Sequence, residues 1–212
     1  MELWEKEKFF FEASSINRTR GKRLIRKLDD LKIYVVIAGF KNAKIGDIDR
    51  FFNAVRSKLH DVDAVQFFDA QLVASWQHLY FAAINALTAF ANKTNISNNL
   101  AIETLLYASA QRQIKKATDS FGVKSTTKSI AVLVLAKNEK SADDTLNLVQ
   151  KLISAEHDDT VLEIKREKFV NIKRFFNVSD VELSAKLERK GFEKEALVDL
   201  VIEHGALLAT QR

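Results

Sequence analysis

The stretch SIAVLVLA, at residues 129–136, carries the clearest strand signal in the chain. It is an uninterrupted apolar run rich in β-branched side chains, which favours a β-strand. Its eight residues are far too few to cross a bilayer as a helix. A second run of this kind, KIYVVIAGF, occupies residues 32–40 and ends near Gly39, and shorter strands are predicted at residues 64–68 and 161–164.

Helical spacing of apolar residues marks the segments between these strands. Residues 47–59, for example, carry apolar side chains three and four positions apart, as an amphipathic helix does. Capping-box spacing, in Ser141 with Asp144 and in Ser179 with Glu182, predicts two helix starts. Helices are predicted at residues 47–59, 75–90, 98–118, 141–153, 168–176, 179–189 and 193–208.

The interspersed helices and strands predict the fold class α/β (α+β). We expect a small mixed or antiparallel sheet of three to four strands, packed with about six to seven helices.

Length and composition predict one folded domain, or one domain with an appendage. Of the 212 residues, 47% are hydrophobic and 29% are charged, which is a globular balance. Cysteine is absent, which fits a reducing cytosol, and no apolar run is long enough to span a membrane. We therefore expect a cytoplasmic protein with a basic arm at residues 1–30 and a single domain at residues 31–212.

No constellation of catalytic residues is evident. The chain has neither a glycine-rich phosphate loop nor a G-x-S-x-G elbow, and its paired carboxylates are better explained by solvation and helix capping. Its histidines are scattered, with none at ligand spacing to another: His60, His78, His157 and His204. We expect no enzyme activity, no catalytic residue, no metal and no cofactor. An unrecognised hydrolase or transferase site stays open as an alternative, without residues behind it.

A cationic group with neighbouring amides lies on the helix predicted at residues 98–118. Basic residues three and four apart on a helix fall on one side of it, and the ring of Tyr107 is close in sequence. Such a group could hold a single-stranded RNA end by phosphate contacts and stacking. The alternative is a solvated helix end whose cations complement the helix dipole. The candidate RNA-binding residues are Arg112, Lys115, Lys116, Asn99 and Gln113.

The same predicted helix carries apolar residues on more than one face. Leu105 and Leu106 are about 100° apart around a helix, so they tend to face different surroundings. One interpretation places both in the core. The other makes one of them the anchor for a protein partner.

The predicted arm contains the densest basic run, with six basic residues among the ten at positions 18–27. Three interpretations are open: an RNA-contacting arm, a charged surface strand, or a partly mobile terminus.

Residues 69–123 resemble the small regulatory subunit of the KEOPS complex, called the PRPK-binding protein in animals. The resemblance is carried by DAQLVA at residues 69–74, AAINAL at 82–87, NISNNLAIETLLYASAQRQI at 95–114 and FGV at 121–123. The QRQI ending is of the archaeal type. Weaker similarity extends the resemblance over roughly residues 30–210, which leaves the basic arm outside it.

This resemblance implies a function that composition alone does not. Subunits of this family perform no chemistry; they dock on the amino-terminal lobe of a small atypical kinase/ATPase. That kinase contacts the subunit that transfers a threonylcarbamoyl group to an adenosine next to the tRNA anticodon. Archaeal relatives help to recruit tRNA by its 3′ CCA end. The resemblance therefore implies two partners, the kinase and tRNA, and neither a membrane nor a small-molecule substrate. The runner-up is a stand-alone RNA-binding protein that uses the arm and residues 98–118.

Overall fold

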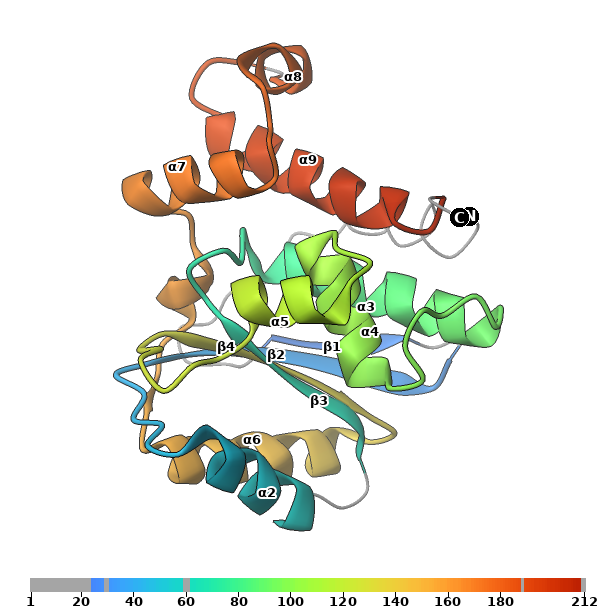
Figure 1. The fold of residues 1–212 in the computed structure, drawn as a ribbon, viewed down its shortest axis with the longest axis vertical. Coiled ribbons are helices and arrows are strands. Elements are labelled where there is room, and N and C mark those ends of the chain that lie inside the picture. The colour runs from blue at the N-terminus through green and yellow to red at the C-terminus, as the bar shows by residue number, and fades with distance from the viewer. Residues whose placement is uncertain (1–23, 29–30, 59–61, 188, 211–212) are drawn as a thin grey trace.

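The computed structural model describes residues 24–28, 31–58, 62–187 and 189–210. These residues form five strands, eight α-helices and one 3-10 helix in a mixed α+β arrangement, which confirms the predicted fold class (Figure 1). No helix in these ranges has the length and apolar character needed to cross a membrane. The strands are β1 (Leu24–Leu28), β2 (Ile33–Lys41), β3 (Val62–Asp69), β4 (Ile130–Ala136) and β5 (Glu156–His157). The helices are α2 (Ile48–Lys58), α3 (Trp76–Ala91), α4 (Leu100–Ser109), α5 (Ile114–Phe121), α6 (Glu139–Ile153), η1 (Asp159–Leu162), α7 (Arg166–Phe175), α8 (Asp180–Lys186) and α9 (Glu193–Leu207).

The sheet is antiparallel, with the strand order β1-β2-β4-β3 and β5 paired with β2. β4 occupies one edge of β2, so β1 and β5 both lie along the other edge, β1 against its first half and β5 against its last two residues. The sheet has one strand more than the predicted maximum. Two short strands were not predicted, β1, which lies within the expected basic arm, and β5, whereas the strand predicted at residues 161–164 does not form.

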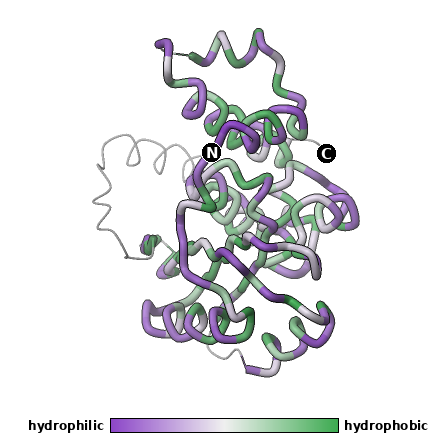
Figure 2. The backbone as a smooth tube through the Cα atoms, turned by 90° about the vertical axis from the view of Figure 1, so that its left-hand side faces the viewer, coloured by the Kyte–Doolittle hydropathy of each residue, from purple (hydrophilic) through white to green (hydrophobic). Residues whose placement is uncertain are grey.

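Both faces of the sheet are covered by helices, and this explains the apolar run at residues 129–136. All seven residues of β4 are fully buried. Leu133 and Leu135 point into the core under α3, α4 and α9, whereas Val132 and Val134 point into the core under α2 and α6. Figure 1 shows α2 and α6 on one side of the sheet and α3 to α5 on the other, with α7 to α9 farther out on that second side. Hydrophilic and hydrophobic positions alternate along α2 and α6, each of which buries one face against the sheet, and Figure 2 shows both kinds of residue along the helices.

The helix predicted at residues 98–118 is wrong as a single element, because it is broken into α4 and α5. Ala110 ends α4 in the left-handed conformation, with φ 49°. The Gln111 N–H donates to the Leu106 carbonyl at 3.1 Å and the Ala110 N–H to the Tyr107 carbonyl at 3.2 Å, which is a Schellman turn. The chain then changes direction, and α5 buries Ala117 and Phe121.

Two other local predictions are corrected. The strand predicted at residues 161–164 does not form: residues 161–162 end the 3-10 helix η1, and residues 163–164 are irregular. The cap of α6 is Asn138, whose side chain accepts from the Ser141 N–H at 2.8 Å, so the cap lies three residues before the predicted one. The second capping box is confirmed: Ser179 and Glu182 bond to each other's backbone N–H at the start of α8.

Gly39 allows η1 to cross close to β2. A Cβ at this position would lie 2.6 Å from the Asp158 carbonyl oxygen and from a Val161 methyl group. The backbone N–H of Gly39 donates to the Asp159 carboxylate, and its carbonyl accepts from the Asp158 N–H, both at 2.8 Å. The glycine in the second apolar run is therefore required by a close approach of backbone.

Two buried charged side chains hold loops against the helices. The Glu103 carboxylate has no exposed surface, and it accepts the Ser97 N–H at 2.7 Å and the Ile96 N–H at 3.0 Å. This contact fixes the loop between α3 and α4. The Lys168 amine donates to the Val161 carbonyl at 2.7 Å and ties α7 to η1. Burial, reinforced by the nearby Lys165, lowers the pKa of Lys168 to about 8.

His78 joins the start of α3 to the end of α4. Its Nδ1 accepts the Ala74 N–H at 3.2 Å, so in the neutral ring the proton is on Nε2, which donates to the Ala108 carbonyl at 2.7 Å. The side chain is 2% exposed, and this burial lowers the pKa of His78 to about 4. The histidine is therefore a neutral structural link.

We predict that this histidine makes stability depend on pH. The pKa of His78 is about 4 in the folded chain and about 6.5 in the unfolded chain, so the unfolded state binds the proton first as pH falls. The stabilisation is complete above pH 6.5 and is lost as pH falls toward 4. At pH 4.5 the loss from this group is about 2 to 3 kcal/mol. Urea unfolding of the wild type and of His78→Asn at pH 7 and pH 4.5 tests this, and an equal pH dependence in both proteins would contradict it.

Candidate RNA and partner interface

The candidate cations lie around the junction of α4 and α5. Arg112 is in the connection between the two helices, and Lys115 and Lys116 are in the first turn of α5. All three are exposed. The break in the predicted helix thus leaves them together, because they span only five residues.

The three cations have different local partners. Nη1 of Arg112 donates to the Leu208 carbonyl at the end of α9, at 3.4 Å. Lys115 forms an ion pair with Asp119 at 2.8 Å, and that carboxylate raises the pKa of the Lys115 amine. Lys116 makes no ion pair with any residue that the structure describes. Part of the positive charge is therefore compensated, and Lys116 carries the least compensated charge of the three.

The two amide candidates have separate positions. Gln113 is the residue before α5, it is exposed, and its side chain makes no capping bond. Asn99 caps the other end of α4, where its Oδ1 accepts the Ile102 N–H at 3.1 Å. The ten residues of α4 separate these two sites by roughly 15 Å. The structure thus groups Gln113 with the cations and places Asn99 away from them.

The partner-anchor interpretation of Leu105 and Leu106 is not supported by their positions. Leu105 is 1% exposed and Leu106 has no exposed surface, because α4 packs against α3, α9 and β3 at once. Both belong to the core, which was the alternative interpretation. Tyr107 is likewise buried, at 4% exposure, so its ring face is not available for base stacking. Burial, followed by the charge of Glu103, raises the pKa of its hydroxyl.

Two exposed apolar side chains that the sequence did not indicate lie next to Arg112. Ile114 at the start of α5 is 47% exposed, and Leu207 at the end of α9 is 52% exposed. The hydrogen bond from Arg112 to Leu208 brings these helix ends together. The surface is therefore mixed, with apolar and cationic groups from α5 and α9. We call it the α5–α9 surface, made of Arg112, Ile114, Lys115, Lys116 and Leu207.

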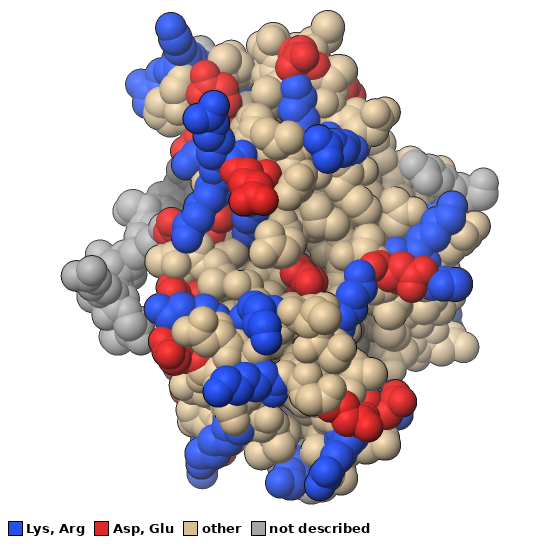
Figure 3. Space-filling model, turned by 60° about the vertical axis from the view of Figure 1, so that its left-hand side comes forward, with Lys and Arg blue, Asp and Glu red and all other residues tan. Residues whose placement is uncertain are grey.

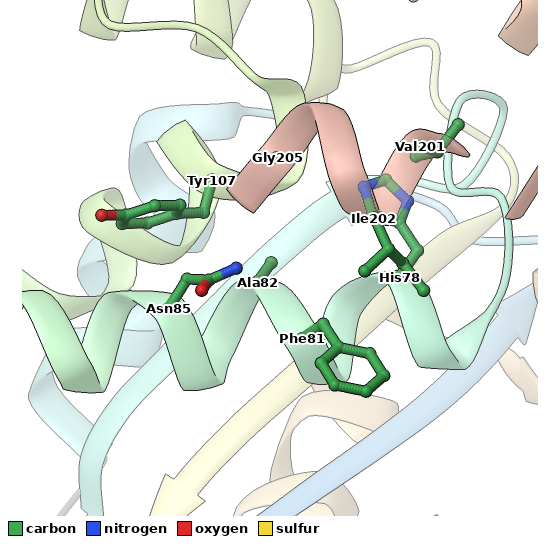
Figure 4. A pocket seen from close by; sticks show the side chains of 8 residues that line it. All are labelled: His78, Phe81, Ala82, Asn85, Tyr107, Val201, Ile202 and Gly205. Atoms are coloured by element: carbon green, nitrogen blue, oxygen red, sulfur yellow. The ribbon is translucent and has the colours of Figure 1, made fainter. Parts of the chain in front are cut away.

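A narrow crevice follows the seam between α3, α4 and α9 (Figure 4). It is too narrow to admit a water molecule. In Figure 4 the Tyr107 ring lies over Asn85 of α3, and His78 lies beneath α9 beside Ile202. The crevice is therefore a packing seam between helices.

One face of the protein carries no single-sign field. On the face in Figure 3, Lys and Arg are interspersed with Asp and Glu. The net charge of the whole chain is only +5. Local grouping of cations therefore indicates more about binding than overall charge does.

The remaining sequence candidates divide between the described and undescribed parts of the chain. Most of the basic run at residues 18–27, and His60, lie outside the described residues. Arg26 and Lys27 lie in β1, which agrees with the surface-strand interpretation for those two positions.

The described histidines beyond His78 are not arranged as metal ligands. His157 Nε2 lies 3.2 Å from an Asp159 carboxylate oxygen without hydrogen-bond geometry, and His204 packs on the Phe176 ring. Within the described residues, no group of three His, Asp or Glu side chains is arranged to hold a metal ion.

A family of kinase-binding proteins matches most of this chain. The family described as kinase binding protein CGI-121 matches residues 47–208, from just before α2 to the end of α9. This is more than half of the chain, and the protein belongs to that family. The match confirms the resemblance to a kinase-binding regulatory subunit.

A relative gives the same identification. The regulatory protein Cgi121 of Methanocaldococcus jannaschii is 30% identical over 135 residues, which is 64% of this chain and 83% of the relative. The family match and this relative agree on the Cgi121 family, and the relative is archaeal, which is consistent with the archaeal type of the QRQI ending.

Proposed function

We propose that this protein is a non-catalytic regulatory subunit of a KEOPS-type tRNA-modifying complex. In this function it binds the small atypical kinase/ATPase of the complex and recruits tRNA by its 3′ CCA end, for threonylcarbamoyladenosine formation next to the anticodon. Membership of the kinase-binding family carries the proposal. The α5–α9 surface supports it, since it offers apolar and cationic groups on neighbouring helix ends.

Isolation from the native host tests the proposal as a whole. We expect the tagged chain to co-purify with a small kinase and with tRNA, and the purified chain alone to show no ATP hydrolysis. Capture of RNA without any kinase would favour the stand-alone RNA-binding protein. Turnover by the pure chain that is abolished by one carboxylate or histidine substitution would contradict the non-catalytic role.

The RNA site is proposed to consist of Arg112, Lys115, Lys116 and Gln113, with Asn99 as a distant contributor. Reversing charge in Arg112→Glu/Lys116→Glu should weaken tRNA binding at least about tenfold, because hydrogen bonds to charged groups contribute about 1.5 kcal/mol or more. The slope of log K against log salt should fall by about 1.4, since each single-strand phosphate contact contributes about 0.7. Filter binding over a salt series measures both.

A matched control is Lys140→Glu/Lys151→Glu on α6, on the opposite side of the sheet. These exposed residues should be replaceable without loss of tRNA binding. If deletion of residues 1–23 abolishes binding while Arg112→Glu/Lys116→Glu preserves it, the basic arm holds the RNA and the helix assignment fails.

The kinase contact is proposed to use the exposed apolar residues of the α5–α9 surface in place of Leu105 and Leu106. Ile114→Glu or Leu207→Glu should weaken the kinase complex by about 2 kcal/mol, roughly thirtyfold in Kd, as removal of an interface anchor does. Titration calorimetry with the purified kinase measures this. Val181→Glu on α8, at 78% exposure, is the control and should bind normally. Normal affinity in both α5–α9 variants would exclude this surface as the kinase site.

A further inference from the structure

We infer that the end of α9 is part of the RNA site, because it holds Arg112 in place, and that Gly205 is the residue that positions it. The inference rests on the proposed tRNA-binding function. Its basis is a chain of three contacts that runs from Gly205 through the carbonyl of Tyr107 to the turn that carries Arg112.

The first contact explains a glycine inside a helix. Gly205 lies within α9, where alanine is ordinarily the more stable residue. A Cβ at this position would lie 2.8 Å from the carbonyl oxygen of Tyr107 on α4. That oxygen belongs to the backbone, so it cannot move aside as a flexible side chain would. Gly205 therefore sets how closely α9 approaches α4, at the seam in Figure 4.

The second contact links the same carbonyl to the turn before Arg112. The Tyr107 carbonyl accepts the Ala110 N–H at 3.2 Å, which is one of the two bonds that close the α4 turn. Ala110 holds a left-handed conformation that is unfavourable for a residue with a Cβ, so the turn depends on these bonds. Pressure on the Tyr107 carbonyl would therefore act directly on the segment that leads to Arg112.

The third contact holds the guanidinium group itself. Leu208 follows Gly205 by three residues, its N–H bonds to the Gly205 carbonyl at 3.1 Å, and its own carbonyl accepts Nη1 of Arg112. Carbonyls at a helix end lack helical partners and attract cations. A guanidinium has five N–H donors in a rigid plane, so the bond to Leu208 also fixes the direction in which its other N–H groups point. A lysine ammonium is a single point on a flexible stem and lacks this fixed geometry.

A tRNA transcript is the probe for this inference, with affinity measured over a salt series. Arg112→Lys keeps the charge but should bind the transcript about threefold to tenfold more weakly. Gly205→Ala should show a similar loss, and its salt slope should fall by about 0.7, the value of one phosphate contact. The double variant should be no weaker than the weaker single variant, because both changes act on one group.

Two substitutions elsewhere serve as matched controls. Gly46→Ala places its new methyl group in open space, and Lys140→Arg exchanges cation types on α6, so both should bind like the wild type. If Gly205→Ala fails to fold in a thermal melt, Arg112→Lys still tests the inference, because normal binding by this exposed, charge-preserving variant would show that a fixed guanidinium is not needed.

The outcomes separate the inference from the function on which it rests. If the wild type does not bind the transcript, the proposed RNA function fails. If the wild type binds and Arg112→Glu/Lys116→Glu does not, while Arg112→Lys and Gly205→Ala bind normally, only positive charge at these positions matters. The positioning role of α9 is then overturned.

Discussion

The burial of β4 on both faces is the constraint on which the rest of the fold depends. None of its seven residues has exposed surface. Antiparallel sheets commonly leave one face in water, but an uninterrupted apolar strand requires a cover on each side. The chain supplies α2 and α6 for one face and α3 to α5 for the other. In this second layer of helices, α3 and α4 are themselves so apolar that most of their residues are buried, and α9 packs over them.

The elements that the sequence predicted well are those with a local signal. The runs at residues 32–40 and 129–136 became β2 and β4, and the box of Ser179 and Glu182 caps α8. The missed features depend on tertiary structure. Alanine at position 110 carries no turn signal, because the left-handed end of α4 is normally marked by glycine. β1 and β5 are short, and only their pairing with β2 distinguishes them from loops.

In the candidate site, too, the features with a local sequence signal were predicted and those that depend on tertiary structure were not. Arg112, Lys115 and Lys116 were predicted to lie together, which five consecutive positions make almost unavoidable. The environments of Leu105 and Leu106 could not be predicted, because helical spacing shows that they face different directions but not that both directions are occupied. The sequence also could not show that Ile114 and Leu207 lie near each other, because the contact between Arg112 and Leu208 joins segments 96 residues apart. The burial of Glu103 was indicated in the sequence only weakly, by the presence of an acidic residue within an apolar helix.

Because the net charge of the chain is small, the position of each cation matters more for binding an anionic partner than the overall charge does. Carboxylates are paired with cations across the described surface, as in Lys115 with Asp119 and Lys186 with Glu203. Exposed charges interact over only about 8 Å at physiological salt, so a net charge of +5 provides little long-range attraction. In the proposed function, affinity for RNA must then come from short contacts, in which a group already held in position loses less entropy on binding. Arg112, bonded to the end of α9, is such a group, whereas Lys116 supplies charge without a fixed geometry.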